Sequence, residues 1–530
     1  MARIRRLFHN PLFLVCATAF LAALLVQSGE LGTSDTTHRL QATHSFWTSE
    51  PPVDPNDYPE FGIHGRNGKL YGWYGIGQSL LMLPADIAGT YAEELSVFAD
   101  YDADPAVRSI VVSYTTNILV CVLALLVCWR LLGLFSFTIN QKIAGVFALL
   151  FCTTFLHYTQ NMMENNYILL LTLTGLAFQY EWLKTGSGGA LFIGSLALGA
   201  NLLTRLTTVV DLLAVLLFLA LTAWLTGIRG SGLRGRFWRY VKIAFPVYVA
   251  FFLMDRAYQY YRFGSFTNTY IQVFGREQKL LNPALPAAYP FETPFRVGFL
   301  GPLITPEKSI FLFDPLLILT VILVIAAWRR FRPDIRAYVI SATALTLGYI
   351  CFYAKFTDWS GDFAWGDRYV STAAQMAAFI SVPLLMRHRA DISRFVWRIG
   401  LALVTASAVV QIASVMFWCP LEIYQMETLG HPTFVIALRL KNILAFSLGK
   451  MNQWGLNNSA MKEDPWDYVH ITTFNFLPFL LARVGKAAGW LVEFLTVVWF
   501  AVLAALIALL VFIRSRAVAG KFEPTQDALR

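Results

Sequence analysis

Charged residues are scarce in this chain, and the centres of its long apolar runs hold almost none. Asp, Glu, Lys and Arg make up 14% of the 530 residues, whereas hydrophobic residues make up 56% and aromatic residues 15%. Several runs reach the length of about 20 apolar residues that crosses a bilayer. The composition therefore excludes a soluble globular domain and indicates a polytopic membrane protein.

Cysteine motifs and nucleotide-binding motifs are also missing. The six cysteines lie inside or at the ends of apolar runs, and no CxxC pair and no His at zinc-finger spacing accompanies them. We expect neither a disulfide nor a thiolate metal site. The chain has no P-loop, no HExxH, no GxSxG and no dinucleotide fingerprint after a strand. Soluble nucleotide-dependent chemistry is disfavoured, and an activated donor would have to come from the membrane.

Twelve apolar runs predict an all-α protein with about twelve transmembrane helices. They cover residues 11–27, 110–129, 143–156, 167–183, 190–204, 207–225, 243–260, 310–328, 337–353, 370–385, 399–418 and 491–513. The first run follows a basic N-terminus and resembles a signal peptide, but no convincing cleavage site follows it, so we expect a retained helix.

The basic residues lie in short loops between these runs. If the helices cross the membrane alternately, every short Arg/Lys-rich loop falls on the side where the chain starts, which predicts cytoplasmic termini. This pattern explains the net charge of +9 better than a nucleic acid partner does.

We expect a single integral membrane domain over residues 1–530 with three long connections on the outer side. These connections cover residues 28–108, 264–309 and 419–490. Loops of this length are uncommon unless they are ordered or functional. Residues 77–91 are apolar but too few to span, which predicts an interfacial helix, and residues 432–448 predict another.

Several ionisable residues fall at the predicted outer face. Asp35 follows the first helix in SGELGTSDTTHRL, where a carboxylate can act as a general base or simply cap a helix in a solvated loop. Glu164 lies in the next outer turn, near His157. Arg205 and Asp211 are spaced to form an ion pair near the outer interface, with a structural or a functional role.

Two later segments add cations. Lys308, in PEKSIFLFDP, precedes an apolar run and is placed to meet a phosphate at headgroup depth, although basic residues at helix ends commonly snorkel to headgroups. The segment DWSGDFAWGDRY carries Asp362, Asp367 and Arg368 beside tryptophans that are typical of an interfacial aromatic belt.

Four segments together resemble the GT-C superfamily of membrane glycosyltransferases. They are GKLYGWYGIGQSLLMLPAD at residues 68–86, LLTRLTTVVDLL at 202–213, GPLITPEKSIFLFDPLLIL at 301–319 and WSGDFAWGDRYV at 359–370. The pattern is similar to the bacterial group that includes protein mannosyltransferases and aminoarabinose transferases. No single segment is decisive, but the four occur in the order that the family shows.

The resemblance implies an inverting glycosyltransferase that moves a hexose or pentose from a polyprenyl-phosphate donor to a glycan, lipid or protein acceptor. It implies that Asp35 is the catalytic base, with Glu164 as a second acid, and it names a divalent cation at these two residues as the candidate cofactor, which some members of the family bind and others do not. It further implies a bacterial cytoplasmic membrane location with an extracytoplasmic active site. The expected substrate-binding residues are Lys308, Arg205, Arg368, His157, Asp211, Tyr74 and Gln78.

Two other readings stay open from the sequence. A transporter or flippase for lipid-linked saccharides would carry polar sites near the membrane midplane, where this chain offers scattered groups such as Asn117, Asn201 and Gln411. A non-catalytic scaffold would keep the architecture without the chemistry. Flux without bond formation, or lipid binding without turnover, would distinguish these readings from an enzyme.

Overall fold

The structure is a computed structural model that describes residues 9–99, 101–227, 231–361, 364–427, 429–451, 473–484, 487–520 and 522. Asp362, the basic N-terminal residues 1–8 and part of the predicted basic loop at 229–242 lie outside this range. The described chain is mostly helical, and its strands are a single short hairpin of β1 (Ile63–His64) and β2 (Leu70–Tyr71). The predicted all-α class is confirmed.

Every predicted apolar run contains at least one helix. The helices are α2 (Pro11–Val26), α5 (Val107–Leu134), α6 (Ile139–Cys152), α8 (Asn165–Thr185), α9 (Gly188–Thr204), α10 (Val209–Leu225), α11 (Ser231–Phe263), α15 (Leu316–Ala327), α16 (Pro333–Tyr353), α17 (Ser371–Phe379), α18 (Ser381–Arg387), α19 (Arg394–Ser414) and α25 (Gly489–Val518). Among the described residues, six helical spans are long and apolar enough to cross a membrane, and four apolar helices are shorter. The total of twelve crossings stays a prediction.

The connections between the runs are helical as well. They contain α3 (Ser34–His44), α4 (Ile76–Glu93), α7 (Phe155–Gln160), α12 (Tyr270–Leu281), α13 (Phe295–Ile304), α20 (Pro420–Glu427), α21 (Val435–Ser447) and α24 (Leu477–Val484), whereas the short α14 (Ile310–Phe313) opens the run at residues 310–328. The helices predicted at 77–91 and 432–448 therefore exist as α4 and α21. Their position at a membrane interface stays a prediction.

The helix predicted at residues 310–328 is broken at a proline. The run at residues 310–328 forms α14 and α15, with Asp314 and Pro315 between them. A residue before proline avoids the helical region, and Asp314 has φ −125° and ψ 72°. The Asp314 carboxylate accepts hydrogen bonds from the Thr154 backbone N–H at 2.7 Å and its hydroxyl at 3.0 Å. The break thus joins α14 to the start of α7.

The basic loops gather at one end of the bundle, which we call the basic end. Lys184 donates to the Leu134 carbonyl at 2.5 Å and Arg236 to the Leu183 carbonyl at 2.9 Å. Arg387 donates to the carbonyls of Phe135 and Ser136, so it contacts the same loop as Lys184. These contacts place the loops at one end of the bundle, and their side of the membrane stays a prediction.

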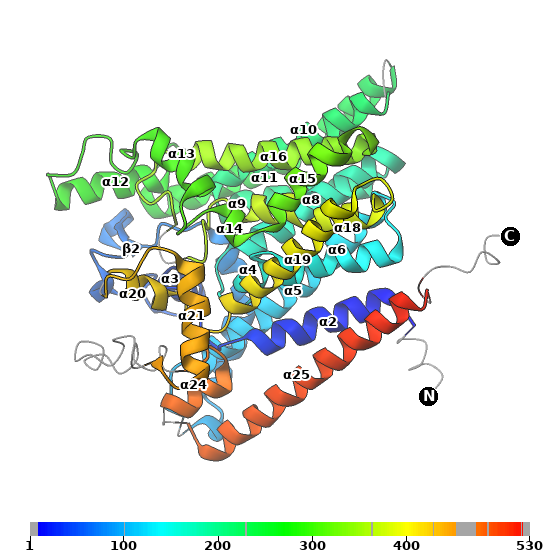
Figure 1. The fold of residues 1–530 in the computed structure, drawn as a ribbon. Helices are drawn as coiled ribbons and strands as arrows, with labels where there is room; N and C mark the ends of the chain where they lie inside the picture. The colour runs from blue at the N-terminus through cyan, green and yellow to red at the C-terminus, as the bar shows by residue number, and fades with distance from the viewer. Residues whose placement is uncertain are drawn as a thin grey trace.

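The helices of the long connections lie at the opposite end, which we call the loop end. In Figure 1, α3, α12 and α20 lie at the left, while α2 begins and α25 ends at the right. The helices α2 and α25 pack side by side, and the Trp499 indole donates to the Leu25 carbonyl at 2.9 Å. The division of the chain into one membrane domain with three outer connections stays a prediction.

Candidate functional site

Asp35 lies in the first turn of α3 at the loop end. Thr33 caps this helix by accepting a hydrogen bond from the Thr36 backbone, so Asp35 is free for other partners. One oxygen of Asp35 accepts from the Tyr74 hydroxyl at 2.6 Å, and the other accepts from the Arg368 guanidinium at 2.7 Å. Its side chain is 17% exposed. Asp35 is therefore neither the helix cap nor a solvated loop residue.

These partners determine the protonation state of Asp35. Burial alone would raise the pKa of Asp35, but Arg368 and Arg39, with the hydrogen bonds from Tyr74 and Arg368, lower that pKa well below its usual range. Asp35 is thus ionised at neutral pH. It is ready to accept a proton, but its basicity is held down by the cations around it.

Glu164 joins two further arginines at the same end. It forms ion pairs with Arg39, at 2.8 Å, and with Arg205. The Glu164 side chain is 3% exposed. Sequence reasoning missed Arg39, although its spacing of four residues from Asp35 on one helix places both on the same face.

The expected pair between Arg205 and Asp211 is not found among the ion pairs of the described residues. Arg205 turns to Glu164 instead. Asp211, on α10, accepts hydrogen bonds from the hydroxyls of Tyr349 and of Thr172, the latter at 2.9 Å. Neutral donors from neighbouring helices satisfy Asp211 inside the bundle, so its nearness in sequence to Arg205 did not decide its partner.

Aromatic rings hold the three arginines in place. The Arg39 guanidinium lies 4.2 Å from the centre of the Tyr74 ring. Arg205 and Arg368 lie 5.0 Å and 5.2 Å from the ring centre of Tyr369. A cation over an aromatic face is attracted by the ring quadrupole, which limits the movement of the side chain. We call Asp35, Glu164, Arg39, Arg205 and Arg368 the charged cluster; its formal charge is +1.

Lys308 contacts the segment just before Arg368 and forms no ion pair with the cluster among the described residues. Its ammonium donates to the carbonyls of Ala364 at 3.0 Å and Gly366 at 3.4 Å, just before Arg368. The Asp367 carboxylate accepts a hydrogen bond from the Tyr369 backbone N–H at 2.9 Å. Burial raises the pKa of Asp367 to about 7, although this hydrogen bond and the charge of Lys308 act to lower it. In this structure Lys308 supports the turn that presents Arg368.

The other expected residues occupy separate positions. His157 is 1% exposed, and its ring stacks on Trp365 with 5.9 Å between centres. Gln78 is buried, with its amide nitrogen 3.4 Å from the Met162 carbonyl. Neither residue has a hydrogen bond or an ion pair with the charged cluster among the contacts of the described chain. Tyr74 contacts the cluster directly through Asp35.

The four sequence segments that carry the resemblance come together in space. A Cβ added to Gly75 would lie 2.3 Å from the Leu203 carbonyl, so the first and second segments approach more closely than any larger residue allows. A Cβ on Gly301 would lie 2.0 Å from the Trp359 ring, which brings the third segment against the fourth. Arg205 and Arg368 then meet the two carboxylates.

The residues present do not form a ready metal site. Among the described residues, no group of three or more His, Cys, Asp or Glu side chains is arranged to hold a metal ion. Asp35 and Glu164 are each already bound by arginine, and a cation at the same oxygens would face those guanidinium groups. We therefore assign no chemical step to a metal.

Comparison with known proteins gives only distant matches. No protein family model matches the chain, and no curated protein matches it. Among solved structures, the apo oligosaccharyltransferase of Archaeoglobus fulgidus aligns with a TM-score of 0.45 and 14% identity over 77% of this chain and 56% of that one. The archaeal oligosaccharyltransferase AglB from the same organism, in complex with an inhibitory peptide and a dolichol-phosphate, aligns with a TM-score of 0.48 and 14% identity over 76% of this chain.

A third structure, the A. fulgidus enzyme tethered to an acceptor peptide through a disulfide bond, gives a TM-score of 0.47 and 14% identity over 76% of this chain. The alignments span 55–56% of the length of these proteins. At TM-scores below 0.5 and 14% identity, the matches do not by themselves assign an activity to this chain.

Proposed function

We propose that this protein is an inverting glycosyltransferase of the GT-C type, which transfers a sugar from a polyprenyl-phosphate donor to an acceptor on the extracytoplasmic side of a membrane. One observation carries the proposal. An ionised carboxylate, Asp35, meets the guanidinium of Arg368 at the loop end, although 333 positions separate them in the chain. A base and an anion-binding group are thus held side by side.

The charge of the cluster favours a phosphate. Three arginines face two carboxylates, which leaves one positive charge without a counter-ion inside the cluster. Guanidinium groups bind phosphate through paired hydrogen bonds. A donor phosphate placed against Arg368 and Arg205 would have its developing negative charge stabilised as the sugar leaves.

In this proposal the membrane surface begins close to the charged cluster. Val209 opens α10 four residues after Arg205. Its side chain is 41% exposed, and that of Leu213, one turn further along the helix, is 58% exposed. On a helix that crosses a bilayer, such exposed apolar side chains face lipid. A polyprenyl chain lying against α10 would carry its phosphate to the arginines without leaving the hydrocarbon layer.

Arg368 links the donor site to the base. In the structure it occupies one oxygen of Asp35 and holds the pKa of Asp35 low. A donor phosphate competes for the same guanidinium, and when Arg368 turns toward the phosphate, Asp35 loses its strongest neighbouring cation. Its pKa then rises, so Asp35 becomes a better base when the donor is bound.

The reaction balances with these groups. The acceptor hydroxyl gives its proton to Asp35, and its oxygen forms a bond to the anomeric carbon of the sugar. The bond between that carbon and the phosphate oxygen breaks, and its electron pair leaves with the polyprenyl phosphate. Attack from the face opposite the leaving group inverts the anomeric configuration. Asp35 later releases the proton to water.

Asp35→Asn tests the proposal. Asn retains the size of the side chain and a hydrogen-bond acceptor for Tyr74, but it does not accept the proton. With purified protein in proteoliposomes and a panel of polyprenyl-phosphate sugars, release of polyprenyl phosphate should fall about 10²–10⁴-fold. Glu94→Gln, which neutralises an exposed carboxylate at the end of α4, is the matched control and should transfer at the parental rate.

Transfer by Asp35→Asn at the parental rate would remove Asp35 from the role of base. Movement of the intact lipid-linked sugar across the bilayer by the parental protein, with no new glycosidic bond, would replace the enzyme with a flippase. Binding of the donor with neither transfer nor flux would favour the scaffold reading.

A further inference from the structure

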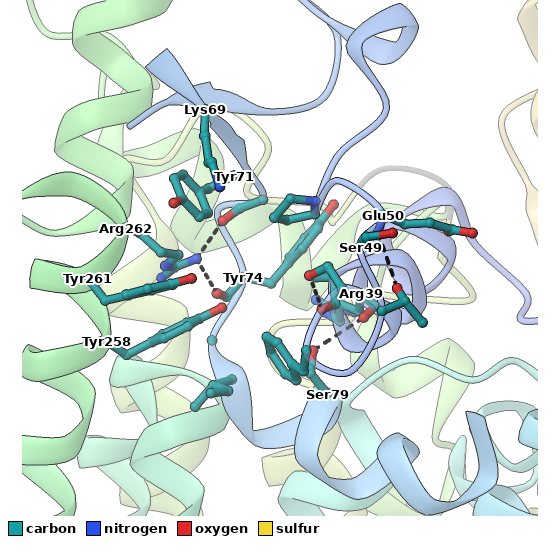
Figure 2. A pocket seen from close by; sticks show the side chains of 18 residues that line it. Arg39, Ser49, Glu50, Lys69, Tyr71, Tyr74, Ser79, Tyr258, Tyr261 and Arg262 are labelled. Carbon is teal, nitrogen blue, oxygen red and sulfur yellow. Dashed lines mark hydrogen bonds between the residues drawn. The ribbon is translucent and has the colours of Figure 1, made fainter. Parts of the chain in front are cut away.

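A cavity of about 470 Å³ lies next to the charged cluster at the loop end. Arg39, a member of the cluster that pairs with Glu164, lines the cavity, and so does Tyr74, which donates a hydrogen bond to Asp35. Asp35 itself does not line the cavity. Figure 2 shows Tyr74 and Arg39 on the wall formed by the first outer connection, opposite the end of α11. A molecule in this cavity would thus be separated from the proposed base by the Tyr74 side chain.

The walls combine aromatic rings with hydroxyl groups. The rings come from Tyr71 and Tyr74 of the first outer connection and from Tyr258 and Tyr261 of α11, with the ring centres of Tyr71 and Tyr261 6.0 Å apart (Figure 2). The hydroxyl groups come from Ser45, Thr48, Ser49 and Ser79. Flat rings pack against the C–H faces of a sugar, and hydroxyl groups exchange hydrogen bonds with its own hydroxyls. The volume falls within the range of roughly 300–1,000 Å³ typical of small-molecule sites.

The cavity is also cationic. Lys69 and Arg262 line it together with Arg39, whereas Glu50 is the acidic residue of the lining. Lys69 is exposed and has no ion pair within 4 Å among the described residues. An anionic group entering the cavity would therefore find a cation that is not already neutralised.

Arg262, which is buried in the cavity wall, also favours an anionic ligand. It is 1% exposed, and one guanidinium nitrogen donates to the carbonyls of Gly72 at 2.5 Å and Tyr74 at 2.9 Å. Its other two nitrogens are buried without a hydrogen-bond partner in the described chain. The Tyr258 ring, with its centre 4.0 Å from the guanidinium, and the charge of Asp255 compensate this buried cation in part, and an anion in the cavity would add to that compensation.

We propose that this cavity is the acceptor subsite and that it binds a saccharide bearing a phosphate or carboxylate group. The proposal rests on the proposed function, because it takes Asp35 as the base that the acceptor hydroxyl must reach. The sugar ring lies among the tyrosines, its anionic group faces Lys69 and Arg262, and a free hydroxyl is directed past Tyr74 toward Asp35.

Lys69 gives the cleanest test, because Arg262 also ties the first outer connection to α11. Gly65 packs so closely on this helix end that an added Cβ would lie 2.3 Å from the Arg262 carbonyl, so changes at Arg262 risk moving the wall. Lys69→Glu reverses an exposed charge at the cavity. Lys355→Glu makes the same reversal at an exposed position that does not line the cavity, and it serves as the matched control.

Direct binding to the full-length protein in phosphatidylcholine nanodiscs measures the ligand class without requiring catalysis. The probes are glucose-1-phosphate, methyl glucuronide, neutral methyl glucoside and inorganic phosphate, followed by calorimetry. We expect the two anionic sugars to bind about tenfold more tightly than the neutral sugar or phosphate alone. Lys69→Glu should weaken anionic-sugar binding by about tenfold, and Lys355→Glu should leave it unchanged.

Equal binding of neutral and anionic sugars, or unchanged binding in Lys69→Glu, would overturn the proposal. Inorganic phosphate binding as tightly as the anionic sugars would reduce the cavity to an anion site. Loss of sugar binding when phosphatidylglycerol replaces phosphatidylcholine would assign it to a lipid headgroup. If anionic sugars bind as expected but Asp35→Asn still transfers, the cavity stands as a saccharide site and the proposed catalytic role of Asp35 fails.

Discussion

The two ends of the helix bundle each contain an aspartate held by a tyrosine and an arginine. At the loop end, Asp35 accepts from Tyr74 at 2.6 Å and from Arg368 at 2.7 Å. At the basic end, Asp334 accepts from Tyr180 at 2.6 Å and from Arg332 at 2.9 Å. The same local chemistry thus occurs twice, so this triad by itself does not identify a site.

What differs is the surroundings of each triad. Arg332 lies two residues from Asp334 and its side chain is 44% exposed, so this ion pair is a local contact near the surface. Arg368 comes from a distant segment, is 13% exposed and lies beside a second carboxylate with two more arginines. Excess buried positive charge, a base and an adjoining cavity occur together only at the loop end of the described chain. Matched changes at the two ends can therefore test the assignment.

The largest contrast is expected between Glu164 and Glu181. Glu164→Gln leaves two nearly buried arginines, Arg39 and Arg205, without their counter-ion, and breaking a buried pair costs about 3–5 kcal/mol of stability. Glu181 pairs with Arg130 at the basic end, where the arginine is 45% exposed, so Glu181→Gln should cost about 0–1 kcal/mol. Thermal unfolding in detergent measures both. Equal losses would mean that burial does not distinguish the two ends.

Arg368 and Arg332 form the second pair. Arg368→Gln removes the proposed phosphate-binding group, and we expect kcat/KM for the lipid-linked donor to fall about 10²–10³-fold. Arg332→Gln breaks a similar bond to an aspartate at the basic end and should change transfer by less than about twofold. The comparison fails if both variants lose activity in parallel, because both would then act through the stability of the bundle.

Glycines provide a steric contrast. Gly75→Ala places a methyl group 2.3 Å from the Leu203 carbonyl, which must push α4 away from α9 at a cost of about 1–3 kcal/mol. Gly235→Ala, in α11 at the basic end, meets no atom within 4 Å and should stabilise that helix by up to about 1 kcal/mol. Unfolding midpoints of the two variants should move in opposite directions. A rise for Gly75→Ala would show that the close approach is not required.

The smallest effect concerns pH. The Tyr74 hydroxyl favours the ionised form of Asp35, so Tyr74→Phe should raise the pKa of Asp35 and move the acidic limb of kcat/KM to higher pH, by less than about one unit. The ring that Arg39 stacks on is retained. Tyr180→Phe removes the equivalent bond to Asp334 and should leave the profile unchanged. A shift in the opposite direction would exclude Asp35 as the group that titrates.

Sequence reasoning placed the helices well because each one leaves a local signal. An apolar run predicts its own position, and the outer helices α4 and α21 appeared as runs too short to span. The break at Asp314 was missed, although Pro315 carried the signal for it. The grouping of the basic loops was predictable as well, because the excess of Arg and Lys can be read from each loop separately.

The partners inside the site were less predictable. Asp35 and Arg368 were both selected from sequence, but their contact joins the first connection to a turn more than 300 residues later. Arg205 was expected to pair with Asp211 and pairs with Glu164 instead, while Asp211 accepts hydrogen bonds from Tyr349 and Thr172 inside the bundle. Such choices depend on tertiary packing, which no spacing rule contains.

The contact between α2 and α25 has a consequence for biosynthesis. The ribosome makes α2 long before α25, yet in the folded protein the Trp499 indole of α25 donates a hydrogen bond to the Leu25 carbonyl of α2, 474 positions earlier in the chain. Until α25 has been made, lipid or a chaperone must cover the flank of α2 that α25 later occupies. Supplying α25 as a separate peptide to a chain that stops before it would show whether this last assembly step can occur after synthesis.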